Sequence, residues 1–131
     1  MRVYVDQIRF GECDCVIVHF ESQLGSAYAR WIGSTPERGI EYDVELEVPG
    51  TLRWGREIRG KSETTVAEER IFEQGGTVHL VGRLESIDEQ GTGTIRFGGD
   101  IVLIEIVDVP RTIPGWVHIC VPQLQLFDIS L

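Results

Sequence analysis

Residues 76 to 107 have the sequence GTVHLVGRLESIDEQGTGTIRFGGDIVLIEIV, and this stretch decides the fold class of the chain. Its first third alternates apolar and polar residues, which is typical of a β-strand with one buried face. Gly82 inside that strand indicates a bend or a close approach of another backbone. DEQGTG at 88–93 predicts a loop and Gly98-Gly99-Asp100 a tight turn. The nearly continuous apolar run at 101–107 predicts a central strand.

Upstream of this stretch, the same pattern predicts further strands. Residues 2–10 and 15–20 form a hairpin in this interpretation, and a β-bulge accounts for a slip of the alternation between Val5 and Ile8. Residues 40–48 alternate cleanly, so Tyr42, Val44, Leu46 and Val48 should face inward. After the turn at Pro49-Gly50, residues 51–58 should return antiparallel, with Leu52 and Trp54 inward. Downstream, residues 116–121 and 124–131 should be the closing strands.

Two stretches lack a clear strand pattern. Residues 23–39 are rich in small residues, and we expect a connecting loop with one helical turn at 26–31. Thr65 and Glu68 have capping-box spacing, and Gly75 is placed as a helix stop, which favours a short helix over 66–73. The β-branched residues at 64–66 keep an extended conformation open as the alternative.

The pattern as a whole predicts an all-β protein of eight or nine short strands with at most one short helix, in one domain spanning residues 1–131. Such strands build a small barrel or a sandwich. The glycine-bent strand, the Gly-Asp turn and the helix before the late strands resemble an OB-fold, over about residues 40–131. The strand count exceeds the five of a simple OB-fold. It therefore leaves room for an OB-like barrel with an added N-terminal hairpin, or for a different sandwich.

No membrane span and no secretory leader are apparent in the sequence, so we expect a cytoplasmic protein. The cysteines Cys13, Cys15 and Cys120 are odd in number, which argues against a disulfide framework. Cys13 and Cys15 have a spacing that would put both thiols on one side of a strand, but the histidines complete no zinc pattern. We expect no metal site and treat the three cysteines as small buried hydrophobes.

Enzymatic motifs are missing from the sequence. There is no G-x-S-x-G motif and no glycine-rich phosphate loop, and His19, His79 and His118 lie on separate predicted strands. General acid–base catalysis needs a desolvated carboxylate, whereas the carboxylates at 41–47 are predicted to face solvent. We therefore expect a non-enzymatic protein with no catalytic residues and no cofactor.

Charge suggests a binding function. The chain has a net charge of −9, and Glu41, Asp43, Glu45 and Glu47 would form an acidic stripe on one strand. Crowded like charges repel, so a partner rich in Arg and Lys would relieve the repulsion and be steered to the stripe. In size and charge the chain is similar to bacterial immunity proteins that neutralise toxic nucleases. We expect protein–protein binding of immunity or inhibitor type to a basic protein. The alternative interpretation is that the stripe serves solubility alone.

The alternative function is the binding of single-stranded oligonucleotides by an OB-like barrel. Its candidate residues are Arg53, Trp54, Arg56, Arg59 and Lys61, because cations follow phosphates and an aromatic ring stacks on a base. The structural alternative is that these arginines pair with nearby acids while Trp54 packs in the core. Net acidity disfavours nucleic acid as a partner. Unpaired strand edges leave both a monomer and a homodimer open.

Overall fold

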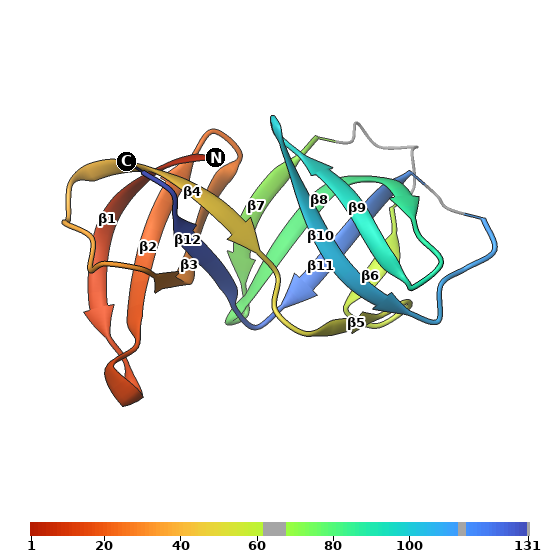
Figure 1. Cartoon of the computed structure of the whole chain (residues 1–131), viewed down its shortest axis with the longest axis horizontal. Helices are drawn as coiled ribbons and strands as arrows, with labels where there is room; N and C mark the ends of the chain where they lie inside the picture. Colours follow the sequence, from red (N-terminus) through yellow and green to blue (C-terminus); the bar gives the residue numbers. More distant parts are fainter. Residues whose placement is uncertain (62–67, 113–114, 131) are drawn as a thin grey trace.

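The structure, a computed structural model, describes residues 1–61, 68–112 and 115–130, and the described residues are built almost entirely from strands (Figure 1). In chain order the elements are β1 (Arg2–Phe10), the 3₁₀ turn η1 (Glu12–Asp14), β2 (Val16–Ser22), β3 (Gly25–Ile32), β4 (Ile40–Glu47), β5 (Thr51–Arg53), β6 (Ile58–Gly60), β7 (Arg70–Gln74), β8 (Thr77–Ile87), β9 (Thr92–Phe97), β10 (Asp100–Val107), β11 (Trp116–Val121) and β12 (Leu124–Asp128). The all-β prediction is confirmed.

Five strands close a barrel, which we call the first barrel, in the order β1-β2-β3-β12-β4 and back to β1. All its pairs are antiparallel except β3 with β12, which is parallel. The β1–β2 hairpin is confirmed, and its register shifts between Val5 and Gln7, where the bulge was expected. The barrel therefore joins the first 47 residues to a strand near the far end of the chain.

The strands between β4 and β12 build a second curved sheet beside the first barrel (Figure 1). Its order is β5-β10-β9-β8-β11-β6, and a bridge between Trp54 and Ile58 links β5 to β6. We call this ring the second barrel. β7 pairs with β8, and a single parallel pair, Gly25 with Ile71, connects β7 to β3. The five-stranded closure thus uses residues 1–47 and 124–128, and not the 40–131 segment expected from the OB-fold resemblance.

Alternating apolar residues explain why these segments form strands. On β4, Val44 and Leu46 are buried and Tyr42 is half-buried, as predicted. One hydrophobic cluster runs through both barrels, and its largest fully buried side chains are Phe20 of β2 and Phe97 of β9. Gly82 was expected to allow a close backbone approach. A Cβ there would lie 2.9 Å from the Arg96 carbonyl oxygen, so the expectation is confirmed.

The loop predicted at 23–39 was wrong over its first half, because Gly25–Ile32 is strand β3. Ala27, Ala29 and Trp31 are buried, and the residues between them are half-buried. Small side chains gave this stretch a weak strand propensity, but they fit between β2 and β12. Gly25 has φ +131° and lies against the carbonyl of Ile71, so its role is tertiary and has no local signal.

Two other predictions required correction. β5 does not return antiparallel beside β4; it pairs in parallel with β10, because the chain crosses into the second barrel at Pro49 and Gly50. The helix predicted over 66–73 was wrong at 70–73, which belong to β7, and its remaining described residues, 68 and 69, lie outside any helix; 66 and 67 fall outside the described residues. The central strand predicted at 101–107 is confirmed, since β10 pairs with β9 on one side and β5 on the other; its outer face, with Ile101 and Leu103, is exposed.

The cysteines were also predicted wrongly. Cys13 is exposed in the η1 turn, and Cys15 and Cys120 are half-buried, so none is a core residue. Among the described residues, no helix has the length and apolar character needed to cross a membrane.

Candidate functional site

The predicted acidic stripe lies on the outer face of β4. Glu41, Asp43, Glu45 and Glu47 are all exposed. β1 lies on one side of the stripe and β12 on the other, and their paired residues form four cross-strand rows: Tyr4 with Glu41, Arg2 with Asp43, Phe127 with Glu45, and Gln125 with Glu47. We call this surface the acidic face. It combines carboxylates with two aromatic side chains that are not fully buried.

Arg2 interacts with half of the stripe. Its guanidinium lies 3.2 Å from both the Glu41 and Asp43 carboxylates. These hydrogen bonds, that to Asp43 first, raise the pKa of Arg2. Glu45 and Glu47 form no ion pair with any described residue. The negative charge available to a partner is therefore concentrated at the β12 side of the face.

The five residues of the predicted basic site are not brought onto one surface. Arg53 pairs with Asp108, and Arg56 pairs with Glu57 at 3.3 Å. The Glu57 pKa is lowered, chiefly by the hydrogen bond from the Arg53 backbone N–H. Trp54 is half-buried against the core. Arg59 is exposed and Lys61 half-buried, at the β6 edge of the second barrel, where they join residues that the sequence analysis did not group with them.

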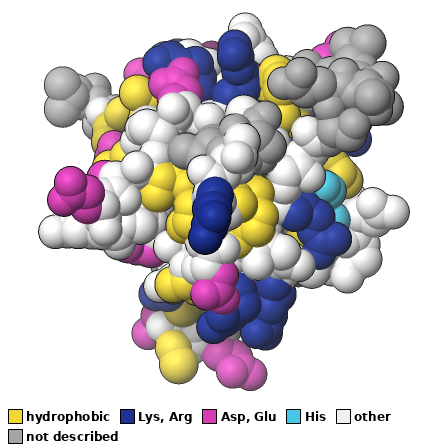
Figure 2. Space-filling model, turned by 90° about the vertical axis from the view of Figure 1, so that its right-hand side faces the viewer, with side chains coloured by type: hydrophobic (Ala, Val, Ile, Leu, Met, Phe, Trp, Pro, Cys, Tyr) yellow, Lys and Arg dark blue, Asp and Glu magenta, His cyan; other side chains and the backbone are white. Residues whose placement is uncertain are grey.

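Arg59 and Lys61 belong to the outer face of β6, β11, β8 and β7, which we call the basic–aromatic face. It carries Arg59, Lys61, Arg70, Phe72, His79, Arg83, Trp116 and His118. One cross-strand row runs Arg59–His118–Val81–Arg70, a second Cys120–His79–Phe72, and a third pairs Trp116 with Arg83. Figure 2 views the end of the molecule that holds the second barrel, and histidine side chains lie beside lysine and arginine side chains at its edge. Since the eight residues come from four strands, no local sequence signal unites them.

Rings and cations alternate on this face. The Phe72 and His79 rings stack with centroids 4.7 Å apart and planes 8° apart, and the His79 and His118 centroids are 5.0 Å apart. The Arg70 guanidinium lies over Phe72 at 4.4 Å and that of Arg83 over Trp116 at 5.7 Å. Such cation–π contacts hold planar cations flat against the rings.

The two histidines of this face share a hydrogen bond. Thr77 donates its hydroxyl proton to the Gln74 carbonyl at 2.8 Å, so it accepts from His79 Nε2 at 3.1 Å. His79 Nδ1 is then the acceptor of a bond from His118 Nε2, at 2.8 Å. Burial first, and then His79, Lys61, Arg59 and Arg70, lower the His118 pKa. Protonation of His118 is therefore disfavoured in the folded protein.

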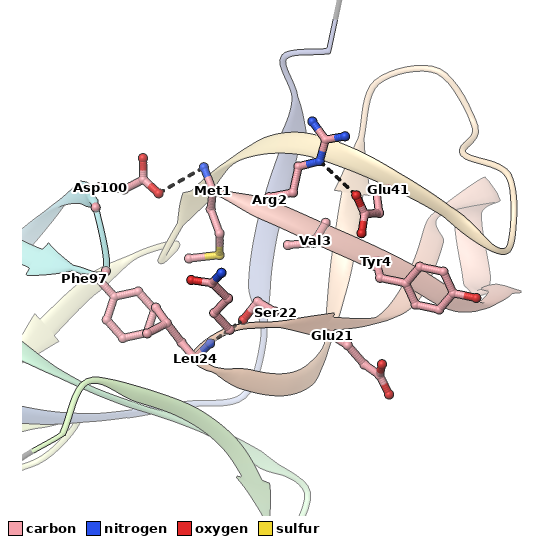
Figure 3. Close-up of a pocket in the computed structure, with 13 residues that line it drawn as sticks. Met1, Arg2, Val3, Tyr4, Glu21, Ser22, Leu24, Glu41, Phe97 and Asp100 are labelled. Atoms are coloured by element: carbon pink, nitrogen blue, oxygen red, sulfur yellow. Dashed lines mark hydrogen bonds and ion pairs between the residues drawn. The ribbon is translucent and has the colours of Figure 1, made fainter.

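A cavity of about 480 Å³ opens where the two barrels meet (Figure 3). Met1, Val3, Leu24 and Phe97 contribute apolar lining. At the rim the Met1 amine pairs with Asp100 at 3.0 Å, and Arg2 pairs with Glu41. Because Arg2, Tyr4 and Glu41 belong to both, the cavity adjoins the acidic face.

No group of three or more potential metal ligands occurs within the part of the chain that the structure describes. No family model matches the chain, and comparisons with curated proteins and with solved structures found no similar protein. A functional proposal therefore rests on the structure itself, which is an all-β barrel fold with one acidic and one basic surface.

Proposed function

We propose that this is a non-enzymatic binding protein that captures a basic protein through its acidic face, in the manner of an immunity protein or inhibitor. The observation that carries the proposal is the exposed row Glu41, Asp43, Glu45 and Glu47 on one strand, of which Arg2 engages only the first two. Glu45 and Glu47 remain available to cations of a partner, and like-charge repulsion between them would be relieved on binding.

The charge of the whole first barrel supports this assignment. Residues 1–47 and 124–128 contain ten Asp and Glu against four Lys and Arg, while residues 48–123 contain eleven against eight. The negative field is thus strongest on the barrel that carries the acidic face. Such a field raises the association rate of a basic partner and orients it before contact.

Aromatic residues and the cavity supply what charge alone lacks. Protein interfaces gain most of their affinity from a few buried anchors, and Tyr and Phe are enriched among interface residues. Tyr4 is 39% exposed beside Glu41, and Phe127 lies beside Glu45. The adjoining cavity, with its apolar lining of Met1, Val3, Leu24 and Phe97, gives one side chain of the partner a place to enter.

The resemblance to an OB-fold is also kept as a proposal, now for the first barrel. An OB-fold is a five-stranded barrel with Greek-key connections. The order β1-β2-β3-β12-β4, in which a distant strand completes the ring, supports this resemblance. The second barrel is then an insertion between the fourth and fifth strands.

Affinity capture from the native lysate, followed by mass spectrometry, tests the proposal. We expect the wild-type protein to retain a protein of basic isoelectric point, and Glu45→Lys/Glu47→Lys to lose it. Glu12→Lys/Glu89→Lys is the matched control, because it makes the same charge change at exposed sites outside the face and should retain the partner. A partner held equally by both double variants, or an acidic partner, would contradict the proposal. Circular dichroism establishes that each variant is folded.

A further inference from the structure

We propose that the basic–aromatic face binds single-stranded nucleic acid, a function separate from capture of a basic protein. This face lies on the second barrel, whereas the acidic face lies on the first (Figures 1 and 2). Of the predicted nucleic-acid residues it keeps only Arg59 and Lys61. It adds Arg70, Phe72, His79, Arg83, Trp116 and His118 from three other strands.

Charge is the first argument. In a chain of net charge −9, four cations, Arg59, Lys61, Arg70 and Arg83, share one sheet face. None of them forms an ion pair with another described residue, in contrast to Arg2, Arg53, Arg56 and Arg96. Cations that are held together and are not engaged in ion pairs attract a polyanion, and binding of phosphates releases the counterions of the strand.

The rings are the second argument, and they select the type of polyanion. Phe72, His79, His118 and Trp116 are half-buried, so part of each ring faces outward. Same-side positions are about 4.8 Å apart between neighbouring strands and about 7 Å apart along one strand. One face of Phe72 is stacked on His79, so this surface offers to bases the ring faces of Phe72 and Trp116 over which the arginines lie. Unpaired bases can stack on it, whereas the bases of a duplex already stack on each other.

The arginines over the rings fit the same ligand. Arg70 and Arg83 lie over Phe72 and Trp116, where they cover the positions that bases would occupy. On binding, each guanidinium can move from the ring to a phosphate, because an arginine serves as both a stacking group and a bidentate phosphate donor. The face is therefore arranged as a set of rings with cations beside each of them.

The histidine pair should make the affinity for nucleic acid depend on pH. The groups that face it are Arg59 and Lys61 at β6, Arg70 on β7, Arg83 and His79 on β8, and Cys120 on β11. In the free protein these cations oppose protonation of His118. A bound phosphate chain offsets their charge, so protonation becomes easier and binding should tighten at lower pH.

Fluorescence anisotropy with a labelled oligothymidylate of about 20 nucleotides tests the proposal at about 50 mM salt. We expect binding that weakens steeply as salt rises, and that is stronger at about pH 6 than at about pH 7.5. Arg70→Glu/Arg83→Glu should weaken it more than about tenfold, since two phosphate contacts are reversed in sign. Arg9→Glu/Arg38→Glu makes the same charge change on exposed residues of the first barrel and should alter affinity less than about threefold.

Ring variants separate stacking from charge alone. Phe72→Leu/Trp116→Leu keeps every cation and should weaken binding about tenfold, because base–ring stacking is lost. Four results would overturn the proposal: no binding at low salt, a duplex of the same sequence binding as tightly, polyglutamate competing as well as the oligonucleotide, or equal losses in the two arginine double variants. Glu45→Gln/Glu47→Gln should leave oligonucleotide binding intact even if it abolishes capture of a basic protein, so failure of one function is distinguishable from failure of the other.

Discussion

The imidazoles of His79 and His118 form a hydrogen bond across two neighbouring strands, with Nδ1 of His79 2.8 Å from Nε2 of His118. One of these two nitrogens must donate and the other accept, so the bond requires that one of them carries no proton. Burial first, and then the neighbouring cations Lys61, Arg59 and Arg70, oppose a positive charge on His118.

This pair predicts a pH-dependent stability. Because the pKa of His118 is lowered on folding, the unfolded chain binds more protons there, and the free energy of unfolding falls as pH falls below the ordinary value of 6.5. We expect wild type to lose stability between about pH 7 and pH 5, and His118→Asn to lose less over the same window. Urea unfolding at both pH values measures the difference.

The two carboxylates whose pKa values are shifted act below the pH range of this test. The pKa values of Glu57 and Glu85 are lowered, Glu57 by the Arg53 backbone N–H and Glu85 by the Arg96 guanidinium, so both remain ionised above their ordinary value of 4.5. Their contribution to stability is lost only at lower pH. Identical slopes for wild type and His118→Asn between pH 7 and pH 5 would contradict the assignment.

The junction between the barrels depends on the absence of a side chain at Gly25. A Cβ there would lie 1.9 Å from the Ile71 carbonyl oxygen, and φ is +131°. Gly25→Ala should destabilise the protein by more than about 2 kcal/mol, because β3 and β7 must separate. Gly50→Ala is the control: its φ is +84° with open space around it, so only the backbone cost of about 1 kcal/mol applies. Equal losses in urea unfolding would show that the contact does not matter.

A buried leucine and an exposed leucine together provide a test of the core. Leu124 on β12 is fully buried, whereas Leu103 on β10 is 61% exposed. Leu124→Ala should cost about 2–5 kcal/mol, from lost burial and the cavity left behind, and Leu103→Ala less than about 0.5 kcal/mol. Thermal or urea unfolding measures both. A large loss for Leu103→Ala would mean that the outer side of β10 is covered in solution.

Arg2 tests the acidic face independently of the partner. Its ion pairs with Glu41 and Asp43 are exposed, so Arg2→Gln should leave the unfolding midpoint nearly unchanged. The same change frees two carboxylates and should tighten the binding of an oligolysine peptide, measured by calorimetry at low salt. Weaker binding of the peptide by this variant would show that Arg2 is part of the docking surface and not a competitor for it.

The sequence was sufficient for the strands whose burial alternates. The inward side of residues 40–47, the bulge after Val5 and the close approach at Gly82 are all local consequences of period-two burial. It was not sufficient at 25–32 or 70–74. Each of these strands pairs with its neighbour in the chain, β3 with β2 and β7 with β8, but their small or mixed side chains show no clear alternation. On β10 the outward residues Ile101, Leu103 and Val107 are apolar, so the sequence there does not show that only one face is buried.

The two candidate faces also differ in how far the sequence could predict them. The acidic face follows one strand, so four residues at spacing two predicted it. The basic–aromatic face is assembled across four strands, with Arg59 beside His118 and Phe72 beside His79, and only the pairing register reveals it. Net charge, which disfavoured a nucleic-acid partner, is an average over the acidic first barrel and a second barrel in which one face is basic.

The wall of the first barrel is completed by β12, which follows all the strands of the second barrel in the chain. During synthesis, β1 to β4 leave the ribosome with the closing edges of β3 and β4 unpaired, whereas β5 to β11 emerge as one continuous segment. All strands of the second barrel are thus synthesised before the first barrel can close, and until then the first barrel has two unpaired strand edges. Slow maturation and a need for protection of the nascent chain against edge-to-edge aggregation follow from this chain order.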